Sequence, residues 1–198
     1  MSNKLVYKLS KVILGIFALY FLYLFTQALE VVNRRYLGTS NGTYINSTTE
    51  NPELYALANE LTQECQDKTC QVQSLLDYVS NIPYRINDFN AHSPQQTIKL
   101  NFGDCDDKSN LLISLLHELN IESYFVLVPK HIFVIVSLDE MLPEKKALYL
   151  DNIPFYILES TSKNSKVGFP FKYKIAEIRE IIEPFENRKL EIDRVDYK

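Results

Sequence analysis

The sequence is poor in the residues that build metal and redox centres. It contains three cysteines and three histidines among 198 residues. Its histidines and carboxylates form no group at the spacing that metal ligands need, so we expect neither a metal nor a cofactor. Cys65 and Cys70 are separated by four residues, which is not the CxxC spacing of thiol redox enzymes or zinc sites. In an oxidising compartment this pair can form a disulfide and leave Cys105 as the free thiol.

The chain also lacks a long basic run and any interleaved basic and aromatic stretch. Its formal net charge is -4. Both features argue against nucleic acid as a partner. The hydrophobic fraction of 46% and the charged fraction of 23% are those of an ordinary folded protein, and the length suits one domain plus a tail.

One long apolar run stands near the N-terminus. The segment Val12–Leu29 has no charged residue and no polar face. As a helix it would reach roughly 27 Å, close to the thickness of a hydrocarbon core. Three lysines precede it, which favours a cytoplasmic N-terminus over residues 1–11 and a transmembrane signal anchor over 12–30. The protein is then a single-pass protein of the cytoplasmic (inner) membrane whose domain faces the periplasm or the exterior.

A cleaved signal peptide is the alternative reading of this run. The apolar region of such a peptide is usually shorter, and Thr26-Gln27-Ala28 fits a cleavage site poorly. Residues 31–52, which follow, are rich in Ser, Thr, Asn and Gly, and we predict a polar linker there. The N-glycosylation triplets at Asn41 and Asn46 are of the kind that such a stretch generates by chance.

The remaining sequence changes from helical to strand-like periodicity. Apolar residues at helical spacing predict helices over 52–65, over 69–80 and after Asp104, with a long polar loop over 85–103. β-rich runs predict strands over residues 123–128, 132–136, 147–150 and 155–158. Helices followed by strands indicate an α+β fold whose strands form an antiparallel meander. We predict a last helix and a charged, frayed tail over residues 173–198.

One cysteine stands where a reactive thiol is expected. Asp104 is a natural N-cap, so Cys105 lies at the start of a helix, a position that favours the thiolate. His131 begins a strand of the sheet that would pack on this helix, and it is the candidate base. Asp151 and Glu159 both have the chemistry to orient the imidazole.

The carboxylates around Cys105 act in the opposite direction. Asp104, Asp106 and Asp107 disfavour a thiolate by charge repulsion, so the His131 partner has to outweigh them. Taken alone, Cys105 could equally be an inert buried cysteine.

The same residues resemble the transglutaminase-like superfamily. The run 103–107, Gly-Asp-Cys-Asp-Asp, looks like the GxCxD nucleophile motif of that superfamily. His131–Val134 resembles its His-aromatic-Val strand, and Tyr156–Thr161 is similar to its Leu-Asp-x-Thr segment. Asn120 stands where the family usually has glycine after the helix, and asparagine tolerates the left-handed conformation. The resemblance runs from about residue 53 to 170.

The resemblance implies a papain-like fold with helices packed on an antiparallel sheet, forming a transglutaminase-like domain over 53–172. It also implies a Cys-His-acid triad of Cys105, His131 and Glu159. Glu159 replaces the family's aspartate, and Thr161 stands two residues later as in the family pattern. Asp151-Asn152 resembles the Leu-Asp-Asn segment of bacterial periplasmic cysteine proteases, so Asp151 is the alternative acid.

We therefore expect a membrane-anchored thiol hydrolase, a cysteine peptidase or amidase, that acts on protein or peptide amides by acyl transfer. A protein-crosslinking transglutaminase would use the same triad with an amine as acceptor, and the sequence does not separate the two. A binding or assembly module that keeps the fold without turnover is the alternative from another class.

Overall fold

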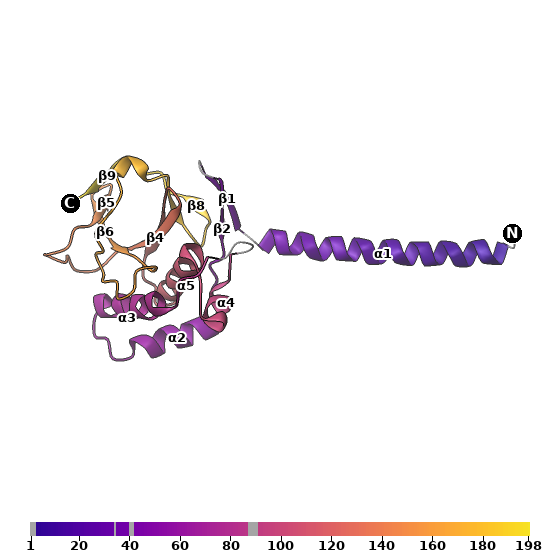
Figure 1. Ribbon diagram of the computed structural model, residues 1–198, viewed down its shortest axis with the longest axis horizontal. Helices are drawn as coiled ribbons and strands as arrows, with labels where there is room; N and C mark the ends of the chain where they lie inside the picture. Colours follow the sequence, from indigo (N-terminus) through magenta and orange to yellow (C-terminus); the bar gives the residue numbers. More distant parts are fainter. Residues whose placement is uncertain (1–2, 34, 40–41, 87–90) are drawn as a thin grey trace. The chain divides into compact units, whose positions relative to one another are not determined.

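The computed structural model describes residues 3–33, 35–39, 42–86 and 91–198. It divides into two units, Met1–Arg35 and Tyr36–Lys198. The first unit is dominated by the helix α1 (Asn3–Asn33), and the second contains the remaining helices and a large sheet (Figure 1).

Helix α1 carries the apolar run. Its segment Val6–Thr26 is long and apolar enough to cross a membrane, and none of its residues is buried within the structure. A signal sequence near an N-terminus has the same properties. This segment contains most of the predicted apolar run Val12–Leu29.

A two-stranded sheet precedes the core helices. Strand β1 (Arg35–Thr39) pairs with β2 (Gly42–Asn46). The prediction of a polar linker over 31–52 is therefore wrong for residues 42–46, which form strand β2. Tyr44 is buried, and its ring packs edge-on against Phe125 with 5.5 Å between centroids. Tyr44 thus packs this largely polar stretch against the core.

Asn46 shows how polar side chains fasten the same stretch. It is only 2% exposed, and its Nδ2 donates to the Pro184 carbonyl. Its Oδ1 accepts hydrogen bonds from the backbone N–H and the hydroxyl of Thr48. The amide of Asn46 is therefore not accessible for glycosylation in the folded domain, whereas Asn41 lies outside the described residues.

Three helices form one layer of the second unit, as predicted. They are α2 (Pro52–Thr62), α3 (Lys68–Asn81) and α5 (Cys105–Glu118). Figure 1 shows them gathered on one side of the sheet. Helix α5 is the central one, since it packs on α2, α3 and the sheet. Asn120 follows it with φ 55°, the left-handed conformation that the sequence predicted.

The loop predicted over 85–103 contains a short helix, α4 (Pro94–Leu100). Ser93 and Gln96 form a capping box, in which each side chain accepts from the backbone N–H of the other. Pro94 suits the first turn because it has no N–H to satisfy. The Ser-Pro-Gln-Gln signal was therefore present, and the prediction missed it because few apolar residues follow. Residues 87–90 of this loop lie outside the described part.

The sheet has seven strands, and each neighbouring pair is antiparallel, which confirms the α+β class. Its order is β8-β7-β3-β4-β6-β5-β9. The meander is not strict, because β6 rather than β5 lies beside β4. The strands are β3 (Ser123–Val128), β4 (His131–Val136), β5 (Leu148–Leu150), β6 (Ile153–Leu158), β7 (Glu180–Glu183), β8 (Arg188–Lys189) and β9 (Val195–Tyr197).

The C-terminal helix predicted from residue 173 is wrong. The segment forms a single 3-10 turn at Ile175–Glu177 and then strand β7, in which Ile182 pairs with Phe125 of β3. The tail is not frayed, since β9 pairs with β5. Isoleucines at helical spacing misled the prediction, and pairing with the free edges of the sheet overrides local propensity.

The sheet separates two hydrophobic cores. Val134 of β4 packs with the helices, whereas Phe133 and Ile135 belong to a second core on the other face. Alternation along the strand puts His131 on the same face as Phe133, and their ring centroids are 6.4 Å apart. His131, the first residue of β4, therefore lies on the face of the sheet that carries the second core.

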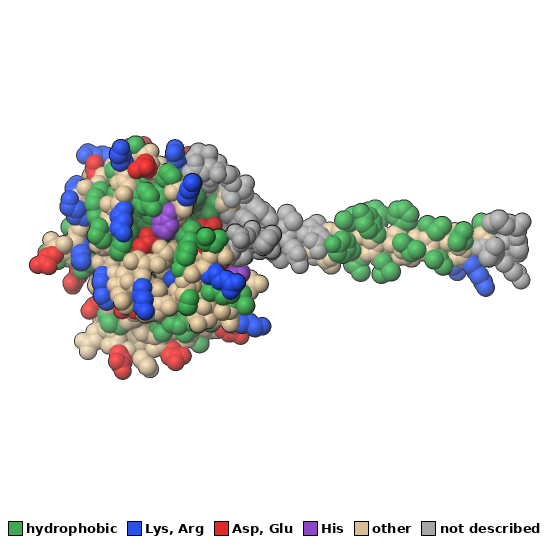
Figure 2. All heavy atoms as spheres, in the orientation of Figure 1, with side chains coloured by type: hydrophobic (Ala, Val, Ile, Leu, Met, Phe, Trp, Pro, Cys, Tyr) green, Lys and Arg blue, Asp and Glu red, His purple; other side chains and the backbone are tan. Residues whose placement is uncertain are grey.

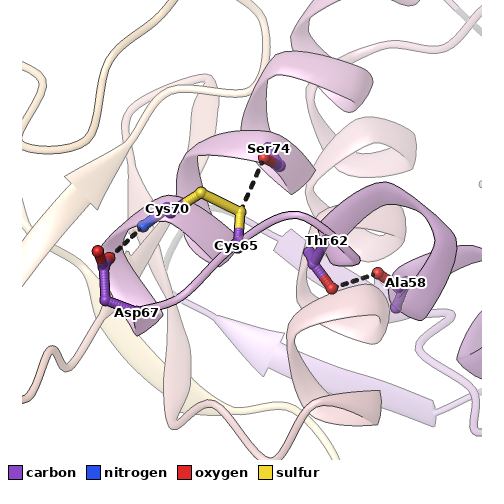
Figure 3. The surroundings of a disulfide bond; sticks show 6 residues. All are labelled: Ala58, Thr62, Cys65, Asp67, Cys70 and Ser74. Atoms are coloured by element: carbon purple, nitrogen blue, oxygen red, sulfur yellow. Dashed lines mark hydrogen bonds between the residues drawn. A yellow bond between two sulfur atoms is a disulfide. The ribbon is translucent and has the colours of Figure 1, made fainter.

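Cys65 and Cys70 form a disulfide that closes the turn between α2 and α3 (Figure 3). We expect the double replacement of both cysteines by serine to lower the free energy of unfolding by about 2 kcal/mol, the chain-entropy value for so short a loop. Denaturant unfolding of the variant and of the reduced wild type measures this loss. Equal midpoints for oxidised and reduced protein would contradict it.

Candidate active site

The first turn of α5 fixes the position of Cys105. The Asp104 side chain accepts from the N–H groups of Asp106 and Asp107, at 3.1 and 3.2 Å, as an N-cap should. Gly103 lies so close to this turn that an added Cβ would stand 2.7 Å from the Asp107 Cβ. The Gly-Asp-Cys run thus makes Cys105 the first residue of the helix, as the sequence predicted.

Asp107 anchors this turn to the loop before α4. It is fully buried, and its Oδ1 accepts from the His92 backbone N–H at 2.6 Å. The His92 Nδ1 also lies 3.1 Å from its Oδ2. His92, for which the sequence required no role, therefore holds the loop against the helix that presents Cys105.

Lys108 ties the same turn to α3, a role that the sequence analysis missed. Its side chain is buried, and Nζ donates to the carbonyls of Ser80 and Ile82 at 3.2 and 2.7 Å. Burial lowers the pKa of Lys108 to about 8, against the opposing effect of the nearby Glu159 charge. The sequence signal for a buried lysine was its position three residues after the cysteine, on a helix with a leucine-rich face.

His131 and Glu159 lie next to each other at one end of two neighbouring inner strands of the sheet. The His131 Nε2 lies 2.8 Å from the Glu159 Oε2, and the two side chains are 18% and 13% exposed. Strands β4 and β6 are antiparallel neighbours, so the first residue of β4 and the last residue of β6 lie at the same end of the strand pair. The structure therefore brings together two of the three residues that the sequence proposed for a triad.

Thr161 holds the carboxylate in place. Its backbone N–H and its hydroxyl donate to the Glu159 Oε1 at 3.1 and 2.5 Å. Burial would raise the pKa of Glu159, but the hydrogen bond and charge of His131, together with Thr161, lower it. An ionised Glu159 accepts the Nε2 proton of His131, which leaves the ring's Nδ1 for a second partner.

Asp151, the alternative acid, lies elsewhere. It is exposed in the turn between β5 and β6, where it has φ 49°. Its Oδ1 accepts from the backbone N–H of Arg194 at 2.9 Å. Asp151 thus fastens the chain leading into β9, and the geometry favours Glu159 as the partner of the imidazole.

The Cys105 thiol lies beside the start of β4. The backbone of Ile132, the residue after His131, hydrogen-bonds to it, and Sγ lies 3.5 Å from the Asp106 Oδ1. Burial raises the pKa of Cys105 to about 12, with further contributions from the charges of Asp106 and Asp104. The charges of Asp106 and Asp104 thus act in the predicted direction, whereas Asp107 is not among the groups that raise this pKa, and the cysteine is a neutral thiol near neutral pH.

This electrostatic arrangement can be tested by replacing Asp106 with asparagine. Loss of the charge lowers the Cys105 pKa, so alkylation by iodoacetamide should become several-fold faster between about pH 7 and 9, since each pKa unit changes the thiolate fraction about tenfold. In the wild type the rate should still be rising at the upper end of this range. Asp193→Asn, at an exposed position, is the matched control and should not change the rate.

A cavity of about 310 Å³ adjoins the histidine and its acid partner. Tyr173 lines it and stacks on His131, with ring centroids 6.3 Å apart. Figure 2 shows histidine side chains at the surface of the domain, with hydrophobic, basic and acidic side chains around them. Tyr173 was missed because it fell in the predicted helix, although aromatics at every second position of 169–173 indicate an extended segment.

Among the described residues, no group of three or more His, Cys, Asp or Glu side chains could hold a metal ion. The histidines outside the pair with Glu159 have other contacts. His117, for example, stacks on Phe185 with 3.6 Å between centroids and lies 3.1 Å from the Glu50 carboxylate.

The family model of the transglutaminase-like superfamily matches residues 55–132. The match includes Cys105 and His131 and ends before Glu159. No curated protein matches the chain.

Two solved structures resemble the fold. A proposed cysteine protease from Cytophaga hutchinsonii is 18% identical, with a TM-score of 0.44, over 74% of this chain and 50% of that one. A proposed protease from Parabacteroides distasonis is 12% identical, with a TM-score of 0.45, over 71% of this chain and 27% of that one. This chain thus spans about half of the first protein and about a quarter of the second, and such distant likenesses do not identify a substrate.

Proposed function

This chain belongs to the transglutaminase-like superfamily, and we propose that it is a membrane-anchored thiol hydrolase that cleaves protein or peptide amides. One observation carries the proposal: the hydrogen bond of 2.8 Å between His131 and Glu159. Cys105, the first residue of α5, lies beside the start of the strand that begins with His131. A neutral thiol needs a positioned base, and this pair supplies one.

The proposed reaction has two halves. In the first, the Cys105 Sγ attacks the substrate carbonyl carbon while His131 takes the thiol proton on Nδ1. The C–N bond then breaks, and His131 returns the proton to the leaving amine, so a thioester remains on Cys105. In the second half, His131 takes a proton from water and the hydroxide attacks the thioester carbonyl. The C–S bond then breaks, the carboxylic acid product leaves, and His131 returns the proton to the Cys105 Sγ. Glu159 stays ionised and stabilises the imidazolium in both halves.

The tetrahedral intermediates carry an oxyanion that needs a hydrogen-bond donor. Asp104 already engages the N–H groups of Asp106 and Asp107. The backbone N–H of Cys105 at the start of α5 is therefore the donor that we propose.

We propose that the Val6–Thr26 segment anchors the protein in the cytoplasmic membrane, with the lysine-containing N-terminus inside and the domain outside. The Cys65–Cys70 disulfide supports this orientation, because such bonds persist in oxidising compartments. Proteolytic accessibility of the domain on intact cells tests it.

The raised pKa of Cys105 favours a second candidate, a binding module without turnover. An assay of the full-length protein in detergent distinguishes the hydrolase, the crosslinking transglutaminase and the binding module. The protein is incubated with a labelled protein and a primary amine. The proposal predicts fragments, absent with Cys105→Ala, and no amine incorporation. Incorporated amine would instead indicate a crosslinking transglutaminase. The absence of both fragments and incorporated amine would favour the binding module.

A further inference from the structure

The cavity beside His131 has a composition that the proposed reaction does not explain. It lies on the face of the sheet where Phe133 and Ile157 form the second core. The Phe133 and Tyr173 rings stack with 6.5 Å between centroids, so the cavity has an aromatic wall next to the imidazole. A volume of about 310 Å³ is at the lower end of the range for small-molecule sites, enough for one or two residues of a peptide.

The segment that closes the cavity is positively charged. Residues 160–176 contain four lysines and neither Asp nor Glu, in a chain whose net charge is -4. Lys172 lines the cavity, and its Nζ lies 4.7 Å from the centroid of the Phe169 ring. Glu159 also lines it, but both of its oxygens are engaged, one by His131 and one by Thr161.

This segment is held in place from two sides. Gln73 of α3 accepts from the Val167 N–H and donates to the Ser165 carbonyl, each at 3.0 Å. The N–H groups of Gly168 and Phe169 donate to the Ile157 carbonyl of β6, at 3.1 and 3.0 Å. The backbone of residues 165–169 is therefore held in place, and this part of the wall needs little ordering when a ligand enters.

We propose that this cavity binds a carboxylate of the substrate next to the bond that is cleaved, with Lys172 as its charge partner. The inference rests on the proposed function and names the substrate class of the same site. Aromatic faces hold the carbon stem of the group, and Lys172, which lines the cavity and is itself exposed, donates a charge-assisted hydrogen bond to its carboxylate. The carboxylate comes either from an acidic side chain or from the free C-terminus of a peptide.

Binding of small probes to the full-length Cys105→Ala protein in detergent tests the proposal. The acidic probes are N-acetyl-glutamate methylamide and N-acetyl-alanine, and the neutral partners are N-acetyl-glutamine methylamide and N-acetyl-alanine methylamide. Ligand-observed NMR should show about tenfold tighter binding of one acidic probe than of its neutral partner. The glutamate probe identifies a side chain as the source, and the alanine probe identifies a C-terminus.

Two lysine variants test whether the preference for an acidic probe depends on Lys172. Lys172→Met keeps the stem on Phe169 and should abolish the preference for the acidic probe. Lys146→Met is the matched control, because Lys146 also lies over a ring, that of Tyr197 at 5.5 Å, and does not line the cavity. Equal binding of acidic and neutral probes, a preference that survives Lys172→Met, or no binding of any probe would overturn the proposal.

The two proposals can fail separately. The binding assay uses a protein without the nucleophile, so it does not depend on turnover. Cleavage of neutral peptides by the wild type, without preference for acidic ones, would overturn the carboxylate site and leave the hydrolase intact. Binding that depends on Lys172, with no turnover of acidic or neutral peptides, would leave the site and overturn the hydrolase.

Discussion

Replacement of His131 by alanine should reduce amide hydrolysis as severely as replacement of Cys105, by on the order of 10⁶-fold if the two act as one unit like a serine-protease dyad. The neutral thiol has a pKa of about 12 and cannot attack without a base, so each residue is useless without the other. The double variant should therefore be no slower than either single variant. Initial rates of the purified full-length variants on one substrate measure this.

His117→Ala is the matched control for that series. His117 lies on the same helix as Cys105, but it stacks on Phe185 and pairs with Glu50. Its loss should change the rate less than about threefold, in keeping with an exposed position. Rate losses that add up in the double variant would contradict a joint role of Cys105 and His131.

Glu159→Gln should lower kcat by on the order of 10⁴-fold, the effect known for the equivalent change of acid to amide in a serine-protease triad. The N–H and hydroxyl of Thr161 require an acceptor, so the glutamine oxygen should turn toward Thr161. Its NH₂ group then faces the His131 Nε2, which has to accept rather than donate. The ring proton moves to Nδ1, where a base for the thiol is needed.

Asp151→Asn is the control that separates the two acids considered for this role. Asp151 accepts from the Arg194 N–H at 2.9 Å, and asparagine can accept the same bond. The variant should keep wild-type kcat. The opposite pattern, with activity lost in Asp151→Asn and kept in Glu159→Gln, would show that the acid partner has been assigned wrongly.

The part of the site that could be predicted from the sequence is the part made by local structure. Asp104 as N-cap and the leucine stripe after it locate Cys105 at the start of a helix. The β-rich runs locate His131 at the first residue of one strand and Glu159 just beyond the end of another. Adjacency of these two strands did not follow from the predicted meander, which would place the strand over 147–150 beside β4, whereas β6 lies there.

The choice between Glu159 and Asp151 could not be made in the same way. Both follow or interrupt short β-rich runs, and both have the chemistry to bind an imidazole. The deciding fact is the register of β6 beside β4, together with a turn that points Asp151 toward Arg194. Register depends on long-range pairing, which a single sequence specifies weakly.

The C-terminal segment and the polar stretch before α2 show a second limit. Ile178 and Ile182 are placed at helical spacing, yet Ile182 is paired in a strand with Phe125. Tyr44 looks like part of a linker, yet it packs against that same Phe125. The open edge and face of β3 decided both outcomes, and neither is visible before the sheet is assembled.

The most direct test of the account is acylation of Cys105 by an activated ester. Cys65 and Cys70 are joined, and Cys105 is the free cysteine. Full-length protein in detergent is mixed with p-nitrophenyl acetate near neutral pH, and the acetylated peptide is identified by mass spectrometry. The account predicts acetyl transfer to Cys105 that is on the order of 10³-fold slower in His131→Ala, the range of general-base catalysis. Acetylation of Cys105 at equal rates in both proteins, or of lysines alone, would contradict it.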